Sequence, residues 1–411
     1  MSMNSTLAIH GGTPVRTAPF QTWPRWDEAD VEAVAAVVRS GRWGRLSGDR
    51  VAAFEREFAA FQGAKYGLAV VNGSVSLRLA LLAVGIQAGD EVIVPPYTFL
   101  ATATSVIEAN AVPIFVDLDP DTYCLDPAAF EAAITPRTRA VIPVHLGGQA
   151  ADMDRICAIA ARHGIAVIED AAHAHGGAYK GRGLGAIGDL GCFSFQASKN
   201  LTSGEGGAIL TNSEELEDKC RALHHCGQRK GGKRFEHPAF GGNYRLGELQ
   251  GALLLSQLRR LKAQTEVRNA NGLYLNEKLA AIPGIRPLAR GRGETVHPYH
   301  LYVFRYDAEV WGVPRARFLA ALRAEGIPGS DGYTIPLYRQ GLFAQKVFGP
   351  YTGYRQTRPD LDYAATDCPV CERVCATEGC WLSQTLLLGP RQDLDDVVAA
   401  VHKLSQQRGE L

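Results

Sequence analysis

The sequence of 411 residues has no excess of charge of either sign and no long apolar run. Lys and Arg together number 43, as do Asp and Glu, so the formal net charge is zero. Without a basic excess, binding to nucleic acids is not expected. No apolar run approaches the roughly 20 residues of a membrane-spanning helix, so no membrane partner is expected. With 46% apolar and 21% charged residues, the composition excludes a wholly disordered or fibrous chain.

A secretory signal and a disulfide scaffold are also missing from the sequence. The first residues, Met1-Ser-Met-Asn-Ser-Thr-Leu, have neither the basic nor the apolar region of a signal peptide, so we expect a cytoplasmic protein. The nine cysteines are too few and odd in number for such a scaffold. Four of them lie within thirteen residues, namely Cys368, Cys371, Cys375 and Cys380.

The spacing of these four thiols allows a zinc or iron–sulfur site. A helix from Pro369 to Cys375 would place three of them on one face, which is also what core packing requires. We therefore predict buried free cysteines and no metal, and equimolar zinc in the purified protein would contradict this prediction.

Between Tyr66 and Thr211, short runs rich in Val, Ile and Phe alternate with stretches of helical period. The predicted strands are Tyr66–Val71, Glu91–Val94, Val112–Val116, Ala140–Pro143, Ala166–Glu169, Gly191–Phe195 and Ala208–Thr211. The predicted helices between them are Ser74–Val84, Leu100–Glu108, Pro127–Ile134 and Asp152–His163. Repeated strand–helix–strand units predict an α/β fold with a mostly parallel sheet and helices on both faces.

Helical patterns also flank this block, at Asp27–Arg39, Val51–Phe61 and Ser213–His225. A long pattern with leucines at helical spacing, Leu246–Leu279, is expected to link two domains. We predict a large domain over residues 1–265, with an N-terminal arm over about 1–30, and a smaller C-terminal α+β domain over residues 266–411.

Ligands of such sheets bind where the strands end, and polar residues follow several of the predicted strands. Asn72-Gly73-Ser74 offers a glycine turn, free N–H groups and a hydroxyl at a helix N-terminus, which suits a phosphate. The alternative is an ordinary helix cap, and the segment matches neither a Walker loop nor G-x-G-x-x-G. Phe99 follows another strand, where it could stack on a planar cofactor or belong to the core.

Asp170 follows the strand Ala166–Glu169, with His173 three residues later. A buried carboxylate there would need a cation, such as a protonated pyridine nitrogen, although Asp170 could also be a helix cap. Lys199 lies between an apolar strand and a glycine-rich turn, with Ser194 five residues before it. A lysine in a semi-apolar cleft has a lowered pKa and can form a Schiff base.

Together these residues supply what pyridoxal 5'-phosphate (PLP) requires: a phosphate cradle, an aromatic stacker, an acid for the ring nitrogen and a lysine for the aldehyde. The freed Lys199 amine would be the base that removes a substrate α-proton and the acid that returns it.

The sequence resembles the DegT/DnrJ/StrS family of PLP-dependent aminotransferases over nearly its whole length. The resemblance implies the PLP-dependent transferase fold type I, which is aspartate aminotransferase-like. The segments that carry it are Val71-Asn72-Gly73-Ser74, Val94-Pro95-Pro96-Tyr97-Thr98-Phe99, Val144-His145-Leu146-Gly147-Gly148-Gln149, Glu169-Asp170-Ala171-Ala172-His173-Ala174-His175-Gly176, Phe193-Ser194-Phe195 to Lys199, Gly204-Glu205-Gly206-Gly207 and Asn243-Tyr244-Arg245.

The resemblance also implies a role for individual residues. Lys199 would be the Schiff-base lysine, Asp170 the partner of the pyridine nitrogen and Phe99 the ring stacker. The other implied cofactor contacts are His173 near the ring hydroxyl, and Ser74, the Val75 amide and Ser194 at the phosphate. Asn243 would reach the phosphate of a second subunit, which implies a homodimer with shared active sites.

The implied reaction moves an amino group from L-glutamate or L-glutamine to a keto-sugar or keto-cyclitol by a two-step aldimine and pyridoxamine mechanism. Similarity to scyllo-inosose aminotransferases and aminohydroxybenzoate synthases favours a cyclitol or free keto-sugar. Gly147 stands where relatives often carry Tyr, and this smaller residue would reshape the substrate pocket. Candidate substrate contacts, each of which could equally be a structural hydrogen bond, are Gln149, Arg245, His300 and Tyr333.

Three other functions stay open. A PLP-dependent lyase or aromatase of the aminohydroxybenzoate synthase type needs the same lysine, and release of an oxo-acid from the amino donor would separate the two. An aminotransferase could instead act on a nucleotide-linked keto-sugar. A non-catalytic regulator is disfavoured, because Lys199, Asp170 and His173 are all present.

Overall fold

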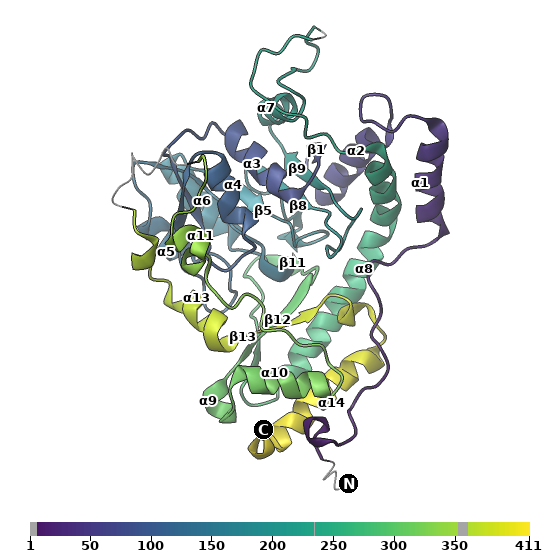
Figure 1. Cartoon of the computed structure of the whole chain (residues 1–411), viewed down its shortest axis with the longest axis vertical. Coiled ribbons are helices and arrows are strands. Elements are labelled where there is room, and N and C mark those ends of the chain that lie inside the picture. The colour runs from purple at the N-terminus through teal and green to yellow at the C-terminus, as the bar shows by residue number, and fades with distance from the viewer. Residues whose placement is uncertain (1–5, 234, 352–360) are drawn as a thin grey trace.

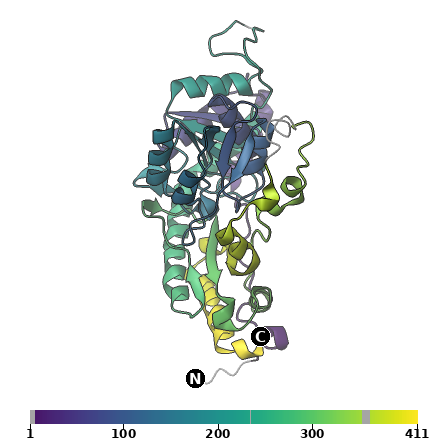
Figure 2. The ribbon, with the colours of Figure 1, turned by 90° about the vertical axis from the view of Figure 1, so that its left-hand side faces the viewer.

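The computed structural model describes residues 6–233, 235–351 and 361–411. Figure 1 shows a broad part built around a large sheet and a narrower part that contains the C-terminal helix, with the long helix α8 (Glu248–Ala280) running from one to the other. Figure 2 shows from the side how the two parts follow one another along the long axis.

The large sheet has seven strands in the order β1-β9-β8-β5-β4-β2-β3. The pairing is parallel from β8 to β3, and β9 runs antiparallel to both β1 and β8. Buried apolar runs form these strands, as expected for a sheet covered on both faces. Their bounds are β1 Tyr66–Val70, β2 Glu91–Val94, β3 Val112–Phe115, β4 Thr138–Val141, β5 Ala166–Asp170, β8 Leu190–Ser194 and β9 Gly207–Thr211. The predicted α/β fold with a mostly parallel mixed sheet is confirmed.

Helices of the large part begin at polar caps and often end at glycines in the left-handed conformation. Asn72, Asp152 and Ser213 each accept a hydrogen bond from a backbone N–H of the helix that follows, and Gly63 and Gly164 end α2 and α6. The bounds are α1 Glu28–Ser40, α2 Arg50–Gln62, α3 Gly73–Ala83, α4 Ala101–Glu108, α5 Pro127–Ala132, α6 Met153–His163 and α7 Glu214–His224.

The narrower part has an antiparallel sheet in the order β10-β12-β13. Its bounds are β10 Ile285–Pro287, β12 Leu301–Tyr306 and β13 Gly379–Ser383, with helices α9 Ala308–Trp311, α10 Arg315–Ala324 and α14 Arg391–Gln406. Leucines of α8 enter both hydrophobic cores: Leu254 and Leu261 pack in the first, Leu275 and Leu279 in the second. The helix thus ties the two parts together, and the boundary at residue 265 stays a prediction.

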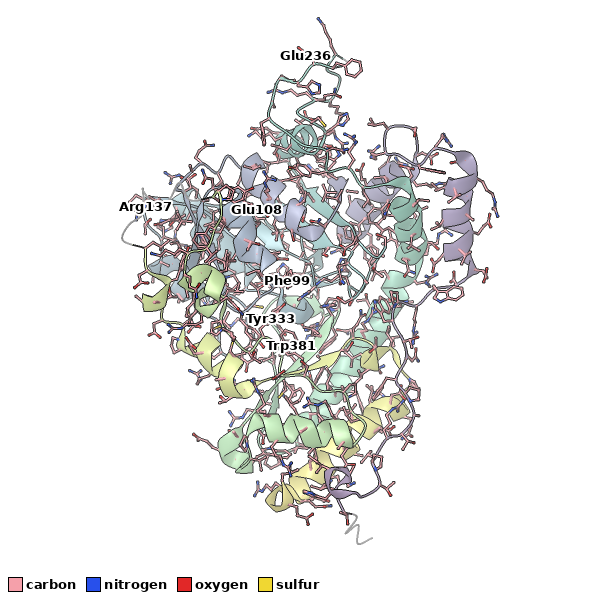
Figure 3. The ribbon with its side chains drawn as sticks, in the orientation of Figure 1. Phe99, Glu108, Arg137, Glu236, Tyr333 and Trp381 are labelled. Carbon is pink, nitrogen blue, oxygen red and sulfur yellow. The ribbon has the colours of Figure 1, made fainter. Side chains whose placement is uncertain are left out.

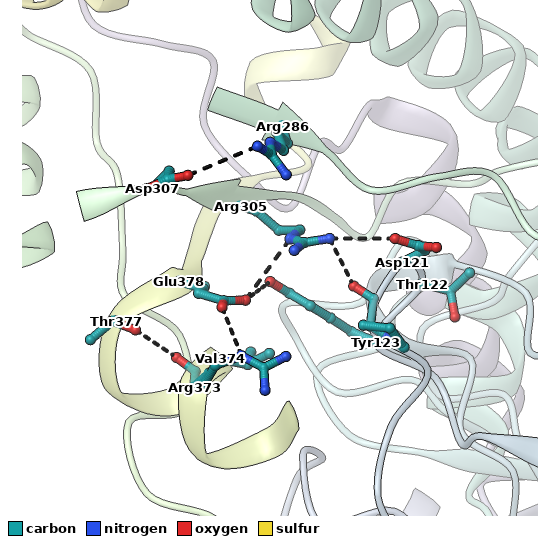
Figure 4. Close-up of polar contacts among 12 residues, drawn as sticks. Asp121, Thr122, Tyr123, Arg286, Arg305, Asp307, Arg373, Val374, Thr377 and Glu378 are labelled. Carbon is teal, nitrogen blue, oxygen red and sulfur yellow. Dashed lines mark hydrogen bonds and ion pairs between the residues drawn. The ribbon is translucent and has the colours of Figure 1, made fainter. Parts of the chain in front are cut away.

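The C-terminal half of the chain also contributes to the first core. Residues of η3 (Leu337–Arg339), α11 (Gly341–Ala344) and α13 (Pro369–Arg373) pack there, including Tyr338 and Phe343. Figure 4 shows a polar link between the two parts. Arg305 of β12 donates to the Pro120 carbonyl at 3.2 Å and lies 3.4 Å from Asp121, and the Tyr123 hydroxyl donates to Glu378 at 3.4 Å.

A third, small sheet was not predicted from the sequence. It joins β6 (Ala178–Tyr179) to β7 (Arg182–Gly183) and to β11 (Glu294–Val296), which lies far along the chain. None of the helices in the described ranges has the length and apolar character needed to span a membrane.

Candidate active site

A cavity of about 540 Å³ opens between the two parts, at the carboxyl ends of β5 and β8. Figure 3 shows Phe99, Tyr333 and Trp381 beside one another in this region. These aromatic residues come from the segment after β2, from a loop of the C-terminal half and from β13. The polar residues that line the cavity include Asn72, Ser74, Thr98, Thr102, Asp170, His173, Ser194, Gln196, Ser198, Lys199, Glu205 and His300.

Lys199 lies in the turn that follows β8, and it is the only Lys or Arg among the described residues lining the cavity. Its backbone N–H donates to the Gln196 carbonyl at 2.9 Å, which closes the turn. Burial lowers the pKa of the Lys199 ammonium to about 8, and the Asp170 carboxylate partly opposes this shift. Lys199 is therefore a lysine that can lose its proton near neutral pH.

Asp170 is the last residue of β5 and is buried. One carboxylate oxygen accepts from the Thr102 hydroxyl at 2.8 Å and the other from the Ala172 N–H at 3.2 Å. Burial raises the pKa of Asp170, while these two hydrogen bonds and the Lys199 ammonium oppose the rise. A carboxylate held in this way has the position and charge to receive a cationic ring nitrogen.

The end of β1 and the start of α3 form a narrow cradle with Ser194. Asn72 caps α3 by accepting from the Val75 N–H at 2.9 Å, while the N–H groups of Gly73 and Ser74 precede the first intrahelical hydrogen bonds. A Cβ atom on Gly73 would lie 2.8 Å from the Cβ of Ser194, so only glycine fits there. The cradle offers free backbone donors at a helix N-terminus, which is an arrangement suited to a phosphate.

Two neutral imidazoles form another wall of the cavity. The rings of His173 and His300 are 4.3 Å apart with an angle of 31° between them. His173 Nδ1 accepts from the Gly147 N–H at 3.1 Å, which assigns its proton to Nε2. Burial lowers the pKa of both imidazoles well below the usual range.

The tautomer of His300 follows from Asn200. The Asn200 Nδ2 donates to the Pro298 carbonyl at 2.8 Å, so its Oδ1 is the group that lies 3.2 Å from His300 Nδ1. His300 therefore donates through Nδ1 and keeps Nε2 as an acceptor. The pair thus has one nitrogen that can donate a hydrogen bond to a ligand, His173 Nε2, and one that can accept a hydrogen bond, His300 Nε2.

Comparison with known sequences identifies the family. The sequence profile of the DegT/DnrJ/EryC1/StrS aminotransferase family matches residues 24–401. The chain belongs to this family. One relative is an L-glutamine:2-deoxy-scyllo-inosose aminotransferase of Streptoalloteichus tenebrarius, which is 41% identical over 98% of this chain and 99% of its own length.

Solved structures give the same assignment. A 3-amino-5-hydroxybenzoic acid synthase matches with a TM-score of 0.86 and 33% identity, over 96% of this chain and 100% of its own. NtdA of Bacillus subtilis, solved with bound cofactor PMP, matches with a TM-score of 0.78 and 28% identity, over 92% and 82%. The protein is thus an aminotransferase of fold type I, as the family resemblance predicted.

The structure brings most of the predicted site residues of this family member into one cavity: Ser74, Phe99, Asp170, His173, Ser194, Lys199, His300 and Tyr333 all line it. The Val75 N–H is already donated to Asn72. Phe99 is 61% exposed in the single chain, although it borders the cavity. The roles of these residues toward a cofactor or substrate stay predictions.

Four predicted residues do not line this cavity in the single chain, namely Val75, Gln149, Arg245 and Asn243. Gln149 is buried beside a separate, narrow cavity with His297. Arg245 donates to His225 at 2.7 Å, and Asn243 lies exposed next to it. These positions leave the expected role of Asn243 in a second subunit as a prediction.

Sequence reasoning missed Thr98, Thr102 and Trp381. The two threonine hydroxyls lie 2.9 Å apart, and the Thr102 hydroxyl donates a hydrogen bond to the Asp170 carboxylate. Their spacing of four residues is a helical signal that could have suggested a shared face. Nothing local marks Trp381, because its contacts with Tyr97 and Tyr333 join distant parts of the chain.

The clustered cysteines are all buried free thiols. Cys371 and Cys375 have their sulfur atoms 4.0 Å apart. The predicted helix Pro369–Cys375 is α-helical as far as Arg373, where α13 ends, and its last two residues begin a π-helix over Val374–Glu378. The backbone carbonyls of Val374 and Cys375, and that of Gly379 just after the π-helix, accept hydrogen bonds from Arg315. Within the described ranges, no group of three or more His, Cys, Asp or Glu side chains could hold a metal ion.

Proposed function

We propose that this aminotransferase uses PLP to move an amino group from L-glutamine to a keto-cyclitol of the 2-deoxy-scyllo-inosose type. The relative from Streptoalloteichus tenebrarius, whose name states this donor and acceptor, supports the proposal. The observation that carries it is the placement of Lys199, in the turn after β8, and Asp170, at the end of the neighbouring strand β5, in one cavity.

The residues present fit PLP. Asp170 is a buried carboxylate suited to a protonated ring nitrogen, Lys199 is the amine for its aldehyde, and the cradle at Gly73 and Ser74 suits its phosphate. When bound, PLP supplies an electron sink that stabilises negative charge at the substrate carbon. We expect His173 Nε2 to donate to its ring hydroxyl and Phe99 to stack on the ring.

Lys199 is the proposed general base and acid. Because burial lowers its pKa to about 8, a useful share of Nζ is unprotonated near neutral pH. With PLP bound, the neutral amine of Lys199 would accept the α-proton of L-glutamine and later donate a proton, and it would do the reverse with the keto acceptor.

The acceptor side of the cavity suits an uncharged polyol. His300 lines the cavity and keeps Nε2 as an acceptor for a substrate hydroxyl, and Tyr333 and Trp381 offer aromatic faces to the apolar side of a substrate ring. A nucleotide-linked sugar is less well served, because Lys199 is the only cation that the described part of this chain places along the cavity. We further propose a cytoplasmic homodimer in which Asn243 completes the partner's phosphate site.

The first experiment is the visible absorption spectrum of the purified protein after addition of PLP. We expect a band from cofactor bound through Lys199, which L-glutamine bleaches with release of the matching oxo-acid. Subsequent addition of 2-deoxy-scyllo-inosose should restore the band. Lys199→Ala should remove band and turnover while circular dichroism stays unchanged; full turnover in this variant would overturn the mechanism.

The lyase or aromatase alternative is supported by the close structural match to 3-amino-5-hydroxybenzoic acid synthase. It shares the lysine and the cofactor, so the spectrum alone does not separate the two functions. A band that persists with every amino donor, together with loss of water from a keto-cyclitol acid, would favour it.

A further inference from the structure

Arg268 of α8 is the largest side chain that the fold buries completely, with 0% of its surface exposed. Its Nη2 donates to Oε1 of Gln384 at 2.5 Å, and its guanidinium carbon lies 5.3 Å from the ring centre of Trp23. Nε and Nη1 have no hydrogen-bond partner among the described residues. Burial lowers the pKa of Arg268 to about 9, and the neighbouring Arg25 adds to this effect.

A guanidinium in this environment is costly, because no carboxylate in the described part of the chain compensates for the desolvation of its charge. An apolar side chain of similar length could fill the same space at a lower cost. The single strong contact that the charged group does make, to Gln384, therefore points to the reason for its presence.

Gln384 follows β13 directly and is only 2% exposed. Its Nε2 donates to the carbonyl oxygen of Ser198 at 2.7 Å, and Ser198 immediately precedes Lys199. Both the oxygen and the nitrogen of this side-chain amide therefore make a hydrogen bond. Because a guanidinium can only donate, Arg268 forces Oε1 of Gln384 toward itself and so directs Nε2 toward Ser198.

The turn that carries Lys199 has further anchors on either side. Trp23 Nε1 donates to the Ala197 carbonyl at 2.9 Å, and the Asn200 side chain donates to the Pro298 carbonyl at 2.8 Å. The Gln384 contact lies between them in sequence. It ties the turn to the end of β13, the strand whose Trp381 borders the cavity.

We propose that Arg268 is a positioning residue for Lys199, acting through the side-chain amide of Gln384 on the Ser198 carbonyl. The inference rests on the proposed role of Lys199 and adds two residues to it, neither of which lines the cavity. The Arg268–Gln384 pair holds the turn tightly closed and so keeps Lys199 buried.

Loosening the turn would let water reach Nζ of Lys199. The desolvation that lowers its pKa to about 8 would then be partly relieved, and the pKa would move toward the ordinary value of 10.5. A role of Arg268 in packing alone would change the stability of the protein without changing this titration.

The test measures the titration of Lys199 in the full-length protein without added PLP. The protein is labelled with acetic anhydride at a series of pH values, and peptide mass spectrometry quantifies acetylated Lys199. The variants are Gln384→Leu, Arg268→Met and the two combined, with Gln406→Glu as an exposed control on α14. Thermal unfolding establishes which variants fold.

We expect a midpoint near pH 8 in the wild type and the control. Gln384→Leu and Arg268→Met should each raise the midpoint by about one unit, a tenfold change in proton affinity. Because both act on one contact, the combined variant should shift no further than Gln384→Leu alone.

Unchanged midpoints in folded variants would overturn the inference. A shift in Arg268→Met without one in Gln384→Leu would also overturn it, because the Arg268 charge would then act on Lys199 directly and not through Gln384. If Gln384→Leu fails to fold, Gln384→Asn, whose shorter amide cannot reach both partners, takes its place with the same expectation. A wild type that forms no visible band with PLP would overturn the proposed function instead, so the two failures are distinguishable.

Discussion

At the scale of single residues, the burial of Lys199 lowers the stability of the fold. Its pKa of about 8 lies below the ordinary value of 10.5, so the folded protein without cofactor binds this proton less tightly than the unfolded chain does. Lys199 therefore destabilises the fold below pH 8, and the penalty disappears as the pH rises to 10.5. The loss of stability arises at the residue whose lowered pKa the proposed proton transfer requires.

Lys199→Met should therefore stabilise the protein without cofactor, by up to about 3 kcal/mol in the free energy of unfolding at pH 7. The gain should shrink between pH 8 and 10.5 and vanish above it. Urea unfolding of both proteins at several pH values measures the difference. An equal difference at every pH would mean that packing, and not proton binding, sets it.

His300 gives a second prediction at this scale. His300→Phe keeps a ring against His173 and removes both the Nε2 acceptor and the Nδ1 donor to Asn200. We expect the KM for the keto acceptor to rise about tenfold, the equivalent of one hydrogen bond, with the glutamine half-reaction unchanged. Stopped-flow absorbance follows each half-reaction separately, and equal losses in both would show that His300 acts on the cofactor instead.

At the scale of elements, the phosphate cradle depends on the close approach of β8 to the start of α3. In Gly73→Ala the new Cβ would lie 2.8 Å from the Cβ of Ser194, so one of the two backbones must shift. We expect at least about a tenfold weaker Kd for PLP, because the donors at the helix N-terminus lose their alignment. Gly44→Ala, where a Cβ meets nothing within 4 Å, is the matched control in an absorbance titration. Equal affinities in the two variants would place the phosphate elsewhere.

The elements also show what a sequence can and cannot predict. The central strands were predicted to within about two residues, because strands buried on both faces form continuous Val- and Ile-rich runs, as in β2. β6, β7 and β11 have two or three residues each and are too short for any periodicity. Asp170 was found because it directly follows the predicted strand Ala166–Glu169, and Lys199 because it lies between the predicted strand Gly191–Phe195 and a glycine-rich turn. Thr102 and Gln384 were missed because their partners lie 68 and 186 residues away in sequence.

At the scale of the whole molecule, the single chain leaves apolar side chains uncovered, both at the cavity and away from it. Phe99 at the cavity is 61% exposed, and Trp43 and Phe240 are 58% and 75% exposed. Phe240 belongs to the segment that projects beyond α7 at the top of Figure 1, and Asn243 follows it closely. The proposed homodimer requires a second copy that covers such side chains and brings Asn243 to its partner's cavity.

Mixing two inactive variants tests this arrangement. Lys199→Ala and Asn243→Ala should each be nearly inactive alone, the first for lack of its amine and the second for lack of a phosphate ligand. If Asn243 serves the partner's site, a mixed dimer holds one site with both residues intact. Co-refolded in equal amounts, the pair should recover about a quarter of wild-type turnover, because half of the dimers are mixed and half of their sites are complete. If Asn243 serves its own chain, every site in the mixed dimer carries one of the two defects. Turnover no higher than the mean of the two parents would then exclude a shared active site, with size-exclusion chromatography confirming that mixed dimers had formed.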